Sequence, residues 1–385
     1  MSPTEAQPTA CSTRSAVGIL VVIAPANADG QSIAPTHVVA GLPLLQRIVL
    51  AARAAGYAEV LLHTELTTRE RPDAGPARIV LLPQNVVPQP AWLRSLLDGP
   101  LERERLATDS SMTMVVETAD PSFVFKTAAR PTSASGLERE LRARYAVSPW
   151  PFDTDGRCAL HTAADVPRAE TWLLRSLIKQ REGFMSRHFE RRISLAITRR
   201  LVRTSITPNA MTAISAAVGL AAAPFFLSTE PAWQLSGALL FLTHSILDGC
   251  DGEIARLKFL QSRYGAVLDF WGDNLVHVAI FACIGLGESW ASAALWPLGA
   301  AAMAIVGGLA SAAVMFRRTV DDRASAGASP SGRVLDALSS RDFIYVVIAL
   351  SAFGKAAWFL VATAIGTPAF LAFALWLDYR HGRVR

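Results

Sequence analysis

The sequence predicts two parts of different fold class, an α/β domain followed by an all-α membrane domain of six transmembrane helices. Before residue 205, charged and apolar residues are mixed in the manner of a globular protein. After it, most of the chain consists of apolar runs long enough to span a bilayer, with the Gly and Ala that allow close helix packing. The chain has 385 residues, of which 51% are hydrophobic, and this composition is typical of a membrane protein that carries a polar module.

The N-terminal part alternates between predicted strands and helices. Residues 1–14 form a polar tail that is predicted to be disordered, and they lack the apolar core of a signal peptide. Beyond the tail, GILVVIAP predicts a buried strand, LPLLQRIVLAARAAGY a helix, and EVLLHT and RIVLLP two more strands. This alternation favours a parallel sheet, so residues 15–182 are predicted to form one α/β domain.

Residues 183–204 predict an amphipathic helix at the membrane surface, ahead of the first span. An apolar stripe is formed by Phe184, Ile193, Ile197 and Leu201, while the arginines between them face lipid headgroups. A solvated linker helix is the alternative for this segment.

The membrane domain is predicted to cover residues 205–385. Its six spans are predicted at 209–228, 232–256, 265–287, 290–316, 342–354 and 356–377. The fifth span is short for a bilayer, and Lys355 separates it from the sixth. The boundaries of these two spans can therefore shift along the chain.

Basic residues set the predicted orientation of the spans. Arginines are concentrated at 187–203, 317–323 and 380–385, whereas the connectors 229–231 and 288–289 contain none. The positive-inside rule then places both termini and the α/β domain in the cytoplasm, in a multi-pass protein of the cytoplasmic (inner) membrane. The net charge of +5 is explained by membrane-facing arginines, so membrane lipids are expected partners and nucleic acid is not.

Four aspartates interrupt the apolar region, in the stretch DGCDGEIARLKFLQSRYGAVLDFWGD. Asp248 and Asp251 are three residues apart, so they share one face of a helix. Asp269 and Asp273 are four apart and share a face in the same way. In a helical hairpin that turns near Leu260, Asp248 lies at the same depth as Asp273, and Asp251 lies at the same depth as Asp269. Since an ionisable residue at the centre of a membrane helix costs roughly 2.5 to 3.5 kcal/mol, four of them need a role.

The most direct role for this cluster is to bind cations. It offers hard oxygen ligands without an accompanying set of His or thiolate ligands, so it suits Mg²⁺, Mn²⁺ or Ca²⁺ better than zinc. Two such ions about 3.5 to 4 Å apart are the usual device for stabilising the attacking and leaving oxygens of a phosphoryl displacement. The alternative is a cation or proton path in a transporter.

Small residues and one cation surround the aspartates in the sequence. Gly252, Ala255 and Gly265 allow close approach of a ligand or of a neighbouring backbone. Arg256 has two interpretations. It holds a phosphate group, or it pairs with Glu253, which lies three residues before it on the same helical face.

These eight positions fit the pattern DxxDGxxARx(8)GxxxDxxxD, which resembles the signature of the CDP-alcohol phosphotransferase family. The resemblance implies transfer of a substituted phosphoryl group from a CDP-alcohol donor to an acceptor alcohol, with release of CMP. It implies Mg²⁺ or Mn²⁺ as cofactor, two ions per site, with Asp248, Asp251 and Asp269 as ligands. It also implies that Asp273 is the general base and a further metal contact, and that the protein forms a homodimer.

The same resemblance extends to a nucleotide site. It implies that the CDP group is contacted by the remaining residues of the pattern, Gly252, Ala255, Arg256 and Gly265. The run PNAMT is also similar to this family, and on that basis Asn209 and Thr212 are assigned to the nucleotide site. Ordinary helix capping is the alternative for these two residues.

The first domain carries a resemblance of its own. Residues 39–62, VAGLPLLQRIVLAARAAGYAEVLL, are similar to nucleotidyltransferases that make activated sugars and polyols, a module that some CDP-alcohol phosphotransferases carry in front. However, no Lys or Arg occurs between Arg14 and Arg47 to hold a triphosphate. Gln84 and Asn85 stand where a metal-binding Asp is expected. We therefore predict a nucleotidyltransferase-like domain that has lost catalysis and serves in docking or regulation.

The predicted donor is CDP-diacylglycerol, because the aspartates lie at lipid depth and the first domain lacks the residues to make a soluble CDP-polyol. CDP-inositol is the alternative, suggested by the fused architecture. Two hypotheses belong to other classes of protein. In a cation-coupled transporter, cytidine nucleotides would have no effect on activity. A scaffold protein would not need to hold four carboxylates in lipid. No motif identifies the acceptor alcohol.

Overall fold

The computed structural model describes residues 17–24, 33–66, 75–130, 133–178, 185–322 and 342–382. Contacts divide the chain into two compact units, Met1–Trp172 and Leu173–Arg385, each with a hydrophobic core of its own. The predicted tail 1–14, Phe184 and the arginines at positions 323, 383 and 385 lie outside the described residues. The domain boundaries at residues 182 and 204 stay predictions.

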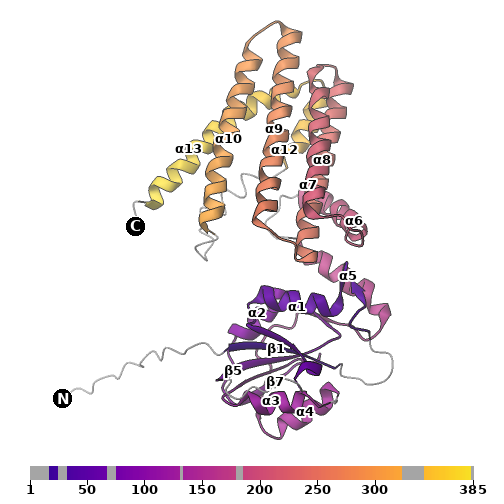
Figure 1. Cartoon of the computed structure of the whole chain (residues 1–385). Coiled ribbons are helices and arrows are strands. Elements are labelled where there is room, and N and C mark those ends of the chain that lie inside the picture. The colour runs from indigo at the N-terminus through magenta and orange to yellow at the C-terminus, as the bar shows by residue number, and fades with distance from the viewer. Residues whose placement is uncertain are drawn as a thin grey trace, which may run out of the picture. The chain divides into compact units, whose positions relative to one another are not determined.

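The first unit is built on a six-stranded mixed sheet with the order β4-β1-β5-β8-β7-β9 (Figure 1). β1 (Val17–Ile23) lies between β4 (Glu59–Leu62) and β5 (Ala77–Pro83) and pairs with both in parallel. β5 is buried along its whole length, as expected for a strand covered on both faces. The predicted parallel pairing is confirmed for these three strands.

The other half of the sheet reverses direction. β8 (Met114–Thr118) runs antiparallel to β5 and to β7 (Arg105–Thr108), and β7 pairs in parallel with β9 (Ala146–Ser148). The expectation of a parallel sheet is therefore wrong for β8. A buried apolar strand such as β8 has the same composition in either direction, because strand direction depends on the connection and not on the pattern.

Helices cover both faces of this sheet (Figure 1). One face carries α1 (Leu44–Ala55) and α2 (Pro90–Asp98), and the other carries α3 (Pro121–Ala128) and α4 (Ala134–Arg142). α1 ends at Gly56, whose φ of 98° is the left-handed conformation that terminates helices and that glycine adopts without strain. The unit is completed by α5 (Val166–Arg175) and by two antiparallel strand pairs, β2 (Val38–Val39) with β3 (Leu42–Pro43) and β6 (Val86–Pro88) with β10 (Arg157–Ala159).

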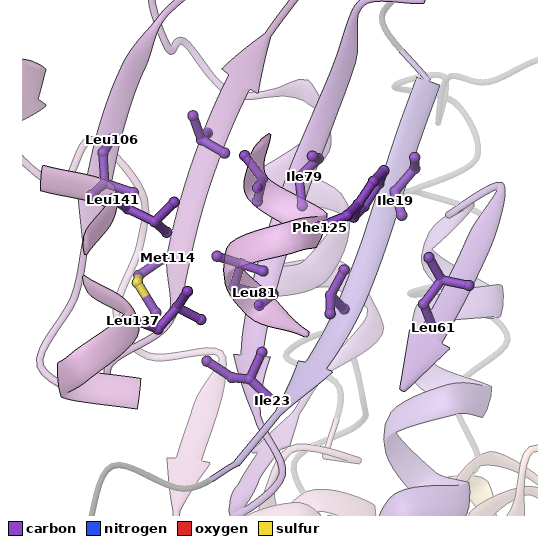
Figure 2. Packing of buried hydrophobic residues seen from close by; sticks show 14 of the residues in the cluster. Ile19, Ile23, Leu61, Ile79, Leu81, Leu106, Met114, Phe125, Leu137 and Leu141 are labelled. Atoms are coloured by element: carbon purple, nitrogen blue, oxygen red, sulfur yellow. The ribbon is translucent and has the colours of Figure 1, made fainter. Parts of the chain in front are cut away.

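One part of the core of the first unit lies between the sheet and α3 and α4. Figure 2 shows Phe125 of α3 next to Ile79 of β5 and Leu137 of α4 next to Met114 of β8, all within one cluster of buried residues. Leu81 is fully buried. Burial of such side chains supplies most of the stabilisation of a domain of this size, roughly 1.5 to 3 kcal/mol for each large aliphatic side chain.

Buried polar side chains in the first unit hold its backbone. Arg47 of α1 donates from Nε and Nη2 to the carbonyl of Val39, at 3.2 and 3.0 Å, and from Nη2 to that of Ala40 at 2.9 Å. Burial lowers the pKa of Arg47 to about 10, an effect that the charge of Glu170 partly offsets. Asn85 donates from Nδ2 to the carbonyl of Leu160 at 2.8 Å. Both contacts are structural, and that of Asn85 occurs where the nucleotidyltransferase resemblance suggests a metal ligand.

The second unit is a bundle of helices (Figure 1). Its elements are η3 (Ser186–Glu190), α6 (Arg191–Leu201), α7 (Pro208–Ala222), η4 (Ala223–Leu227), α8 (Pro231–Lys258), α9 (Arg263–Ser292), α10 (Trp296–Asp322), α12 (Phe343–Ser351) and α13 (Ala356–Gly382). Small residues allow close packing, since a Cβ on Gly285 of α9 would lie 2.6 Å from the Cβ of Ala301 of α10.

Within the described residues, four segments are long and apolar enough to cross a membrane: Pro208–Leu227, Arg263–Ser292, Trp296–Arg317 and Ala356–Trp376. These agree with four of the predicted spans. The other two predicted spans fall on α8 and α12. α8 has the length but carries Gln234, His244 and its aspartates, whereas α12 has only 9 residues. A count of six spans stays a prediction.

Exposed Trp residues lie near both ends of the long helices. Trp271 and Trp290 are exposed on α9, and Trp358 and Trp376 are exposed on α13. At 1.5 Å per residue, the two members of each pair lie about 27–29 Å apart along their helix, close to the hydrocarbon thickness of a bilayer of about 30 Å. Because Trp is enriched at membrane interfaces, this spacing fits helices of the length needed to cross a membrane.

A truncation at Leu81 tests the core of the first unit. Leu81→Ala leaves a cavity in the cluster between the sheet and its covering helices and is expected to lower the local unfolding free energy by about 2–5 kcal/mol. Hydrogen exchange of the β1 and β5 amides in the full chain measures this value. Val147→Ala on β9 is the matched control, because Val147 is 48% exposed. Equal protection in the two variants would contradict the assigned core.

Candidate active site

The aspartates lie on an antiparallel hairpin of α8 and α9. α8 ends where Phe259 adopts a left-handed conformation with φ of 56°, and the chain turns through residues 260–262. Ser262 then begins α9 by accepting a hydrogen bond at Oγ from the Gly265 N–H, at 3.0 Å. The predicted turn near Leu260 thus brings the end of α8 beside the start of α9.

Three of the aspartates form a compact group. Asp248 and Asp251 of α8 and Asp269 of α9 each offer one carboxylate oxygen, and these oxygens all lie within 4.8 Å of one another. Asp248 and Asp251 are 4% and 5% exposed. Carboxylates this close and this buried repel one another strongly unless a cation lies among them, and an all-oxygen set suits Mg²⁺ or Mn²⁺. The donor set therefore fits a divalent ion.

Asp273 lies one helical turn beyond Asp269 on α9, outside the group of three. Its Oδ1 lies 3.2 Å from Nε2 of His244 on α8. Its assigned role as general base and metal contact stays a prediction.

A cavity of about 400 Å³ opens beside the three carboxylates. All six residues that were assigned to the nucleotide site line this cavity: Asn209, Thr212, Gly252, Ala255, Arg256 and Gly265. The walls also include Asp251, Asp269 and Arg263. One cavity thus combines the cationic, small and acidic residues that a diphosphate with its metal would contact.

Residues at the start of α7 contribute to the cavity rather than to helix capping. The cap is Thr207, whose Oγ1 accepts from the Ala210 N–H at 3.2 Å. Thr212 instead donates from Oγ1 to Oδ2 of Asp251, and so connects α7 to the carboxylate group. For Thr212, this contact replaces the capping alternative.

Glycines make room for the cavity walls. A Cβ on Gly265 would lie 2.9 Å from Oδ1 of Asn209 and 3.0 Å from Oγ of Ser262, closer than ordinary contacts allow. A Cβ on Gly252 would lie 3.3 Å from Nη1 of Arg256. Gly265 is therefore explained by the close approach of Asn209, whereas at Gly252 a small shift of the flexible Arg256 side chain would make room for a Cβ.

Glu253 has a role that the sequence did not suggest. This carboxylate is fully buried and accepts hydrogen bonds from Arg191 Nη1 at 2.8 Å, Ser194 Oγ at 2.7 Å and Thr198 Oγ1 at 2.6 Å. All three donors come from α6. Glu253 is therefore held by α6, and the alternative in which it pairs with Arg256 is not what the structure contains.

The apolar stripe of α6 also packs on the bundle. Ile197 and Leu201 contact a buried cluster formed by Met211, Cys250 and Ile254. The Ser194 and Thr198 hydroxyls lie in the same interface, one helical turn apart. Two hydroxyl residues at this spacing beside an apolar stripe indicate, in the sequence alone, that a polar side chain of another helix lies opposite them. α6 is thus fixed to α8 and α7, and its location at the membrane surface stays a prediction.

Comparison with known proteins identifies the helical part. Residues 205–329 match the family model described as CDP-alcohol phosphatidyltransferase. This chain carries a domain of the CDP-alcohol phosphotransferase family. The matched range includes every residue of the carboxylate group and of the cavity.

Curated relatives share part of this chain. The bifunctional IPC transferase and DIPP synthase of Thermococcus kodakarensis is 35% identical over 146 residues, 38% of this chain and 33% of the relative. The protein of the same name from Archaeoglobus fulgidus is 41% identical over 126 residues, 32% of this chain and 25% of the relative. A CDP-diacylglycerol–serine O-phosphatidyltransferase of Mycobacterium tuberculosis is 38% identical over 101 residues, 26% of this chain and 33% of the relative. The matches thus span a third or less of each relative's length.

Among solved structures, the chain is similar to the Mycobacterium tuberculosis phosphatidylinositol phosphate synthase with CDP-DAG bound. The TM-score is 0.35 at 20% identity, over 48% of this chain and 94% of that chain.

Removal of the Glu253 carboxylate tests the contact between α6 and α8. Glu253→Ala leaves the buried Ser194 and Thr198 hydroxyls and the Arg191 cation without their acceptor. Loss of one partner of a buried charged network costs about 3–5 kcal/mol, so thermal unfolding in detergent is expected at a clearly lower temperature. Glu230→Ala at the start of the same helix is the control, because Glu230 is exposed. If both variants unfold at the wild-type temperature, the network does not stabilise the bundle.

Proposed function

We propose that this protein transfers a substituted phosphoryl group from a CDP-alcohol to the hydroxyl of an acceptor alcohol and releases CMP. The observation that carries the proposal is the group of three converging carboxylates beside a cavity whose walls include all six predicted nucleotide residues. The match of residues 205–329 to the CDP-alcohol phosphatidyltransferase family model supports the same reaction.

The residues divide into metal-binding and substrate-binding groups. Asp248, Asp251 and Asp269 would hold Mg²⁺ or Mn²⁺, one or two ions, and Asp273 lies near enough along α9 to complete a second site. A bound divalent ion would neutralise charge on the diphosphate and on the leaving CMP. Arg256 lines the same cavity and offers a fixed positive charge to phosphate oxygens.

Asp273 is the proposed general base. The acceptor hydroxyl must lose its proton as its oxygen bonds to phosphorus, and a carboxylate beside the site accepts that proton. The bond between the same phosphorus and the bridging oxygen of the diphosphate breaks, and CMP leaves with the electron pair. The side chain of Asp273 is 29% exposed, so an acceptor can reach it.

CDP-diacylglycerol is the proposed donor. Exposed Trp271 lies between Asp269 and Asp273 on α9, which supports a site at the depth of the membrane interface. A lipid-linked diphosphate lies at this depth, with its acyl chains among the helices. CDP-inositol is the alternative, and it is favoured by the names of the Thermococcus and Archaeoglobus relatives.

The rest of the chain is proposed to place and regulate this site. Six spans, both termini in the cytoplasm and location in the cytoplasmic membrane are consistent with the arginine distribution and with the four apolar segments. The first unit is proposed to dock or regulate, because no Lys or Arg lies between Arg14 and Arg47 and because Asn85 bonds to the backbone where a metal-binding Asp is expected.

CMP release by purified protein in lipid tests the reaction. CDP-diacylglycerol and CDP-inositol are each offered with Mg²⁺ or Mn²⁺ and a panel of polyol and polyol-phosphate acceptors. We expect acceptor-dependent release with CDP-diacylglycerol, and a loss of about 10²–10⁴-fold in Asp273→Asn. Asp251→Asn is expected to weaken Mn²⁺ binding measured by calorimetry, which needs no turnover. Folded protein that binds no Mn²⁺ and releases no CMP from either donor, but carries cation flux in vesicles, would favour the transporter.

A second test addresses the nucleotide cavity. Gly265→Ala crowds Asn209 and is expected to weaken CMP binding by about 5- to 100-fold, the equivalent of an overpacking cost of about 1–3 kcal/mol. Gly272→Ala on the same helix is the matched control, because no atom lies closer than 4.0 Å to its added Cβ. Calorimetric titration with CMP distinguishes the two variants. Equal affinities would place the nucleotide elsewhere.

A further inference from the structure

One buried histidine lies beside the proposed base and outside the family pattern. His244 is on α8, one helical turn before Asp248, and its side chain is 1% exposed. Its Nδ1 lies 2.9 Å from the carbonyl oxygen of Ser215 on α7. Its Nε2 lies 3.2 Å from Oδ1 of Asp273 on α9. A single imidazole ring therefore connects α7, α8 and α9, and its Nε2 contacts the carboxylate of the proposed base, Asp273.

The surroundings fix the orientation of this ring. Phe241, one turn before it on α8, stacks on it with ring centroids 6.0 Å apart and planes 15° apart. On the side of α7, a Cβ on Gly219 would lie 2.9 Å from Cγ of His244. The same Cβ would lie 2.6 Å from Cγ1 of Val276 on α9. Glycine at position 219 thus leaves the space that the ring occupies.

Asp273 differs from His244 in exposure. The carboxylate is 29% exposed while the histidine beside it is buried, so Asp273 is anchored from its buried side and open on another. An aspartate on a helix can otherwise rotate about its two side-chain bonds. A hydrogen bond to a rigid, buried ring restricts both rotations.

We propose that His244 is a positioning residue for Asp273, which it orients so that the carboxylate presents the same oxygen to the acceptor hydroxyl at each turnover. The inference rests on the proposed function, in which Asp273 accepts the proton of the acceptor. It assigns to His244 no contact with donor, acceptor or metal. Its effect is on the chemical step, because a base displaced by about 1 Å costs on the order of 100-fold in rate.

The two amide replacements of histidine separate the two hydrogen bonds. In His244→Gln, the amide nitrogen reaches the position of Nε2 and keeps the contact with Asp273. In His244→Asn, the shorter side chain reaches the position of Nδ1 and keeps only the contact with Ser215. Both substitutions place an amide in the same buried site, so they share any general cost of altered packing.

The measurement is kcat and KM for CMP release by the full chain in lipid. We expect His244→Asn to lower kcat by about 10- to 100-fold with donor KM and Mn²⁺ affinity within about two-fold of wild type. His244→Gln is expected to recover at least about ten-fold of that loss. Thr243→Ala is the control, because Thr243 is exposed on the same helix and its hydroxyl donates to the carbonyl of Leu239 within that helix. Its kcat is expected to stay near the wild-type value.

Two further variants test the connection to Asp273. Gly219→Ala removes no polar group but displaces the ring, so it is expected to lower kcat as His244→Asn does. In the background of Asp273→Asn, His244→Asn is expected to cause no additional loss, because the group that it orients has already been disabled.

The outcomes separate this inference from the function on which it rests. Equal kcat for His244→Asn, His244→Gln and wild type would overturn the positioning role while the reaction stands. Equal losses in both amide variants that persist in the Asp273→Asn background would also overturn it, because they indicate packing alone. A wild-type protein that releases no CMP from any donor would overturn the proposed function, and the role of His244 with it.

Discussion

Repulsion among the carboxylates of Asp248, Asp251 and Asp269 is the constraint on which the second unit depends. Their oxygens converge within 4.8 Å, and two of the three side chains are almost fully buried. In such surroundings each negative charge interacts far more strongly than it would in water. The turn after Phe259 makes the convergence unavoidable, since it folds α9 back along α8. The neighbouring elements must therefore supply cations or hydrogen-bond donors.

The arrangement of donors follows from the helical geometry of α8. Asp251 and Glu253 are two residues apart, so they point to different sides of the helix. Asp251 faces α7, from which Thr212 donates to it. Glu253 faces α6, where one cation and two hydroxyls satisfy it completely. Because its charge is balanced separately, Glu253 adds no further repulsion to the carboxylate group, and it links α6 to the segment of α8 that bears the site.

The sequence predicts contacts within one helix far better than contacts between helices. Spacings of three and four residues within one helix are visible in the sequence, and so the sharing of faces by the aspartates and the hairpin turn near Leu260 could be inferred. Contacts between helices are not visible in this way. His244 and Asp273 are 29 residues apart, and Thr198 and Glu253 are 55 apart, so no local period relates them.

A weaker signal for these contacts was nevertheless present. His244 and Gln234 interrupt an apolar run of α8, and a polar side chain buried among helices requires a partner. The sequence indicates that such a partner exists without naming it. The antiparallel direction of β8 could not be predicted either, because strand direction depends on the connection between strands and not on their composition.

The first unit illustrates the converse problem, in which a residue type suggests chemistry that its contacts do not support. Arg47 is the first Lys or Arg after Arg14, in a segment that resembles nucleotidyltransferases, and its side chain is almost fully buried. Although burial lowers its pKa to about 10, the guanidinium remains charged at neutral pH. Its hydrogen bonds go to the carbonyls of Val39 and Ala40, in a turn where Ala40 adopts a left-handed φ of 45°. A cation that stabilises such a turn cannot leave it to bind a phosphate without exposing those carbonyls. The contacts of Arg47 are therefore structural, and they stabilise the turn at Val39 and Ala40.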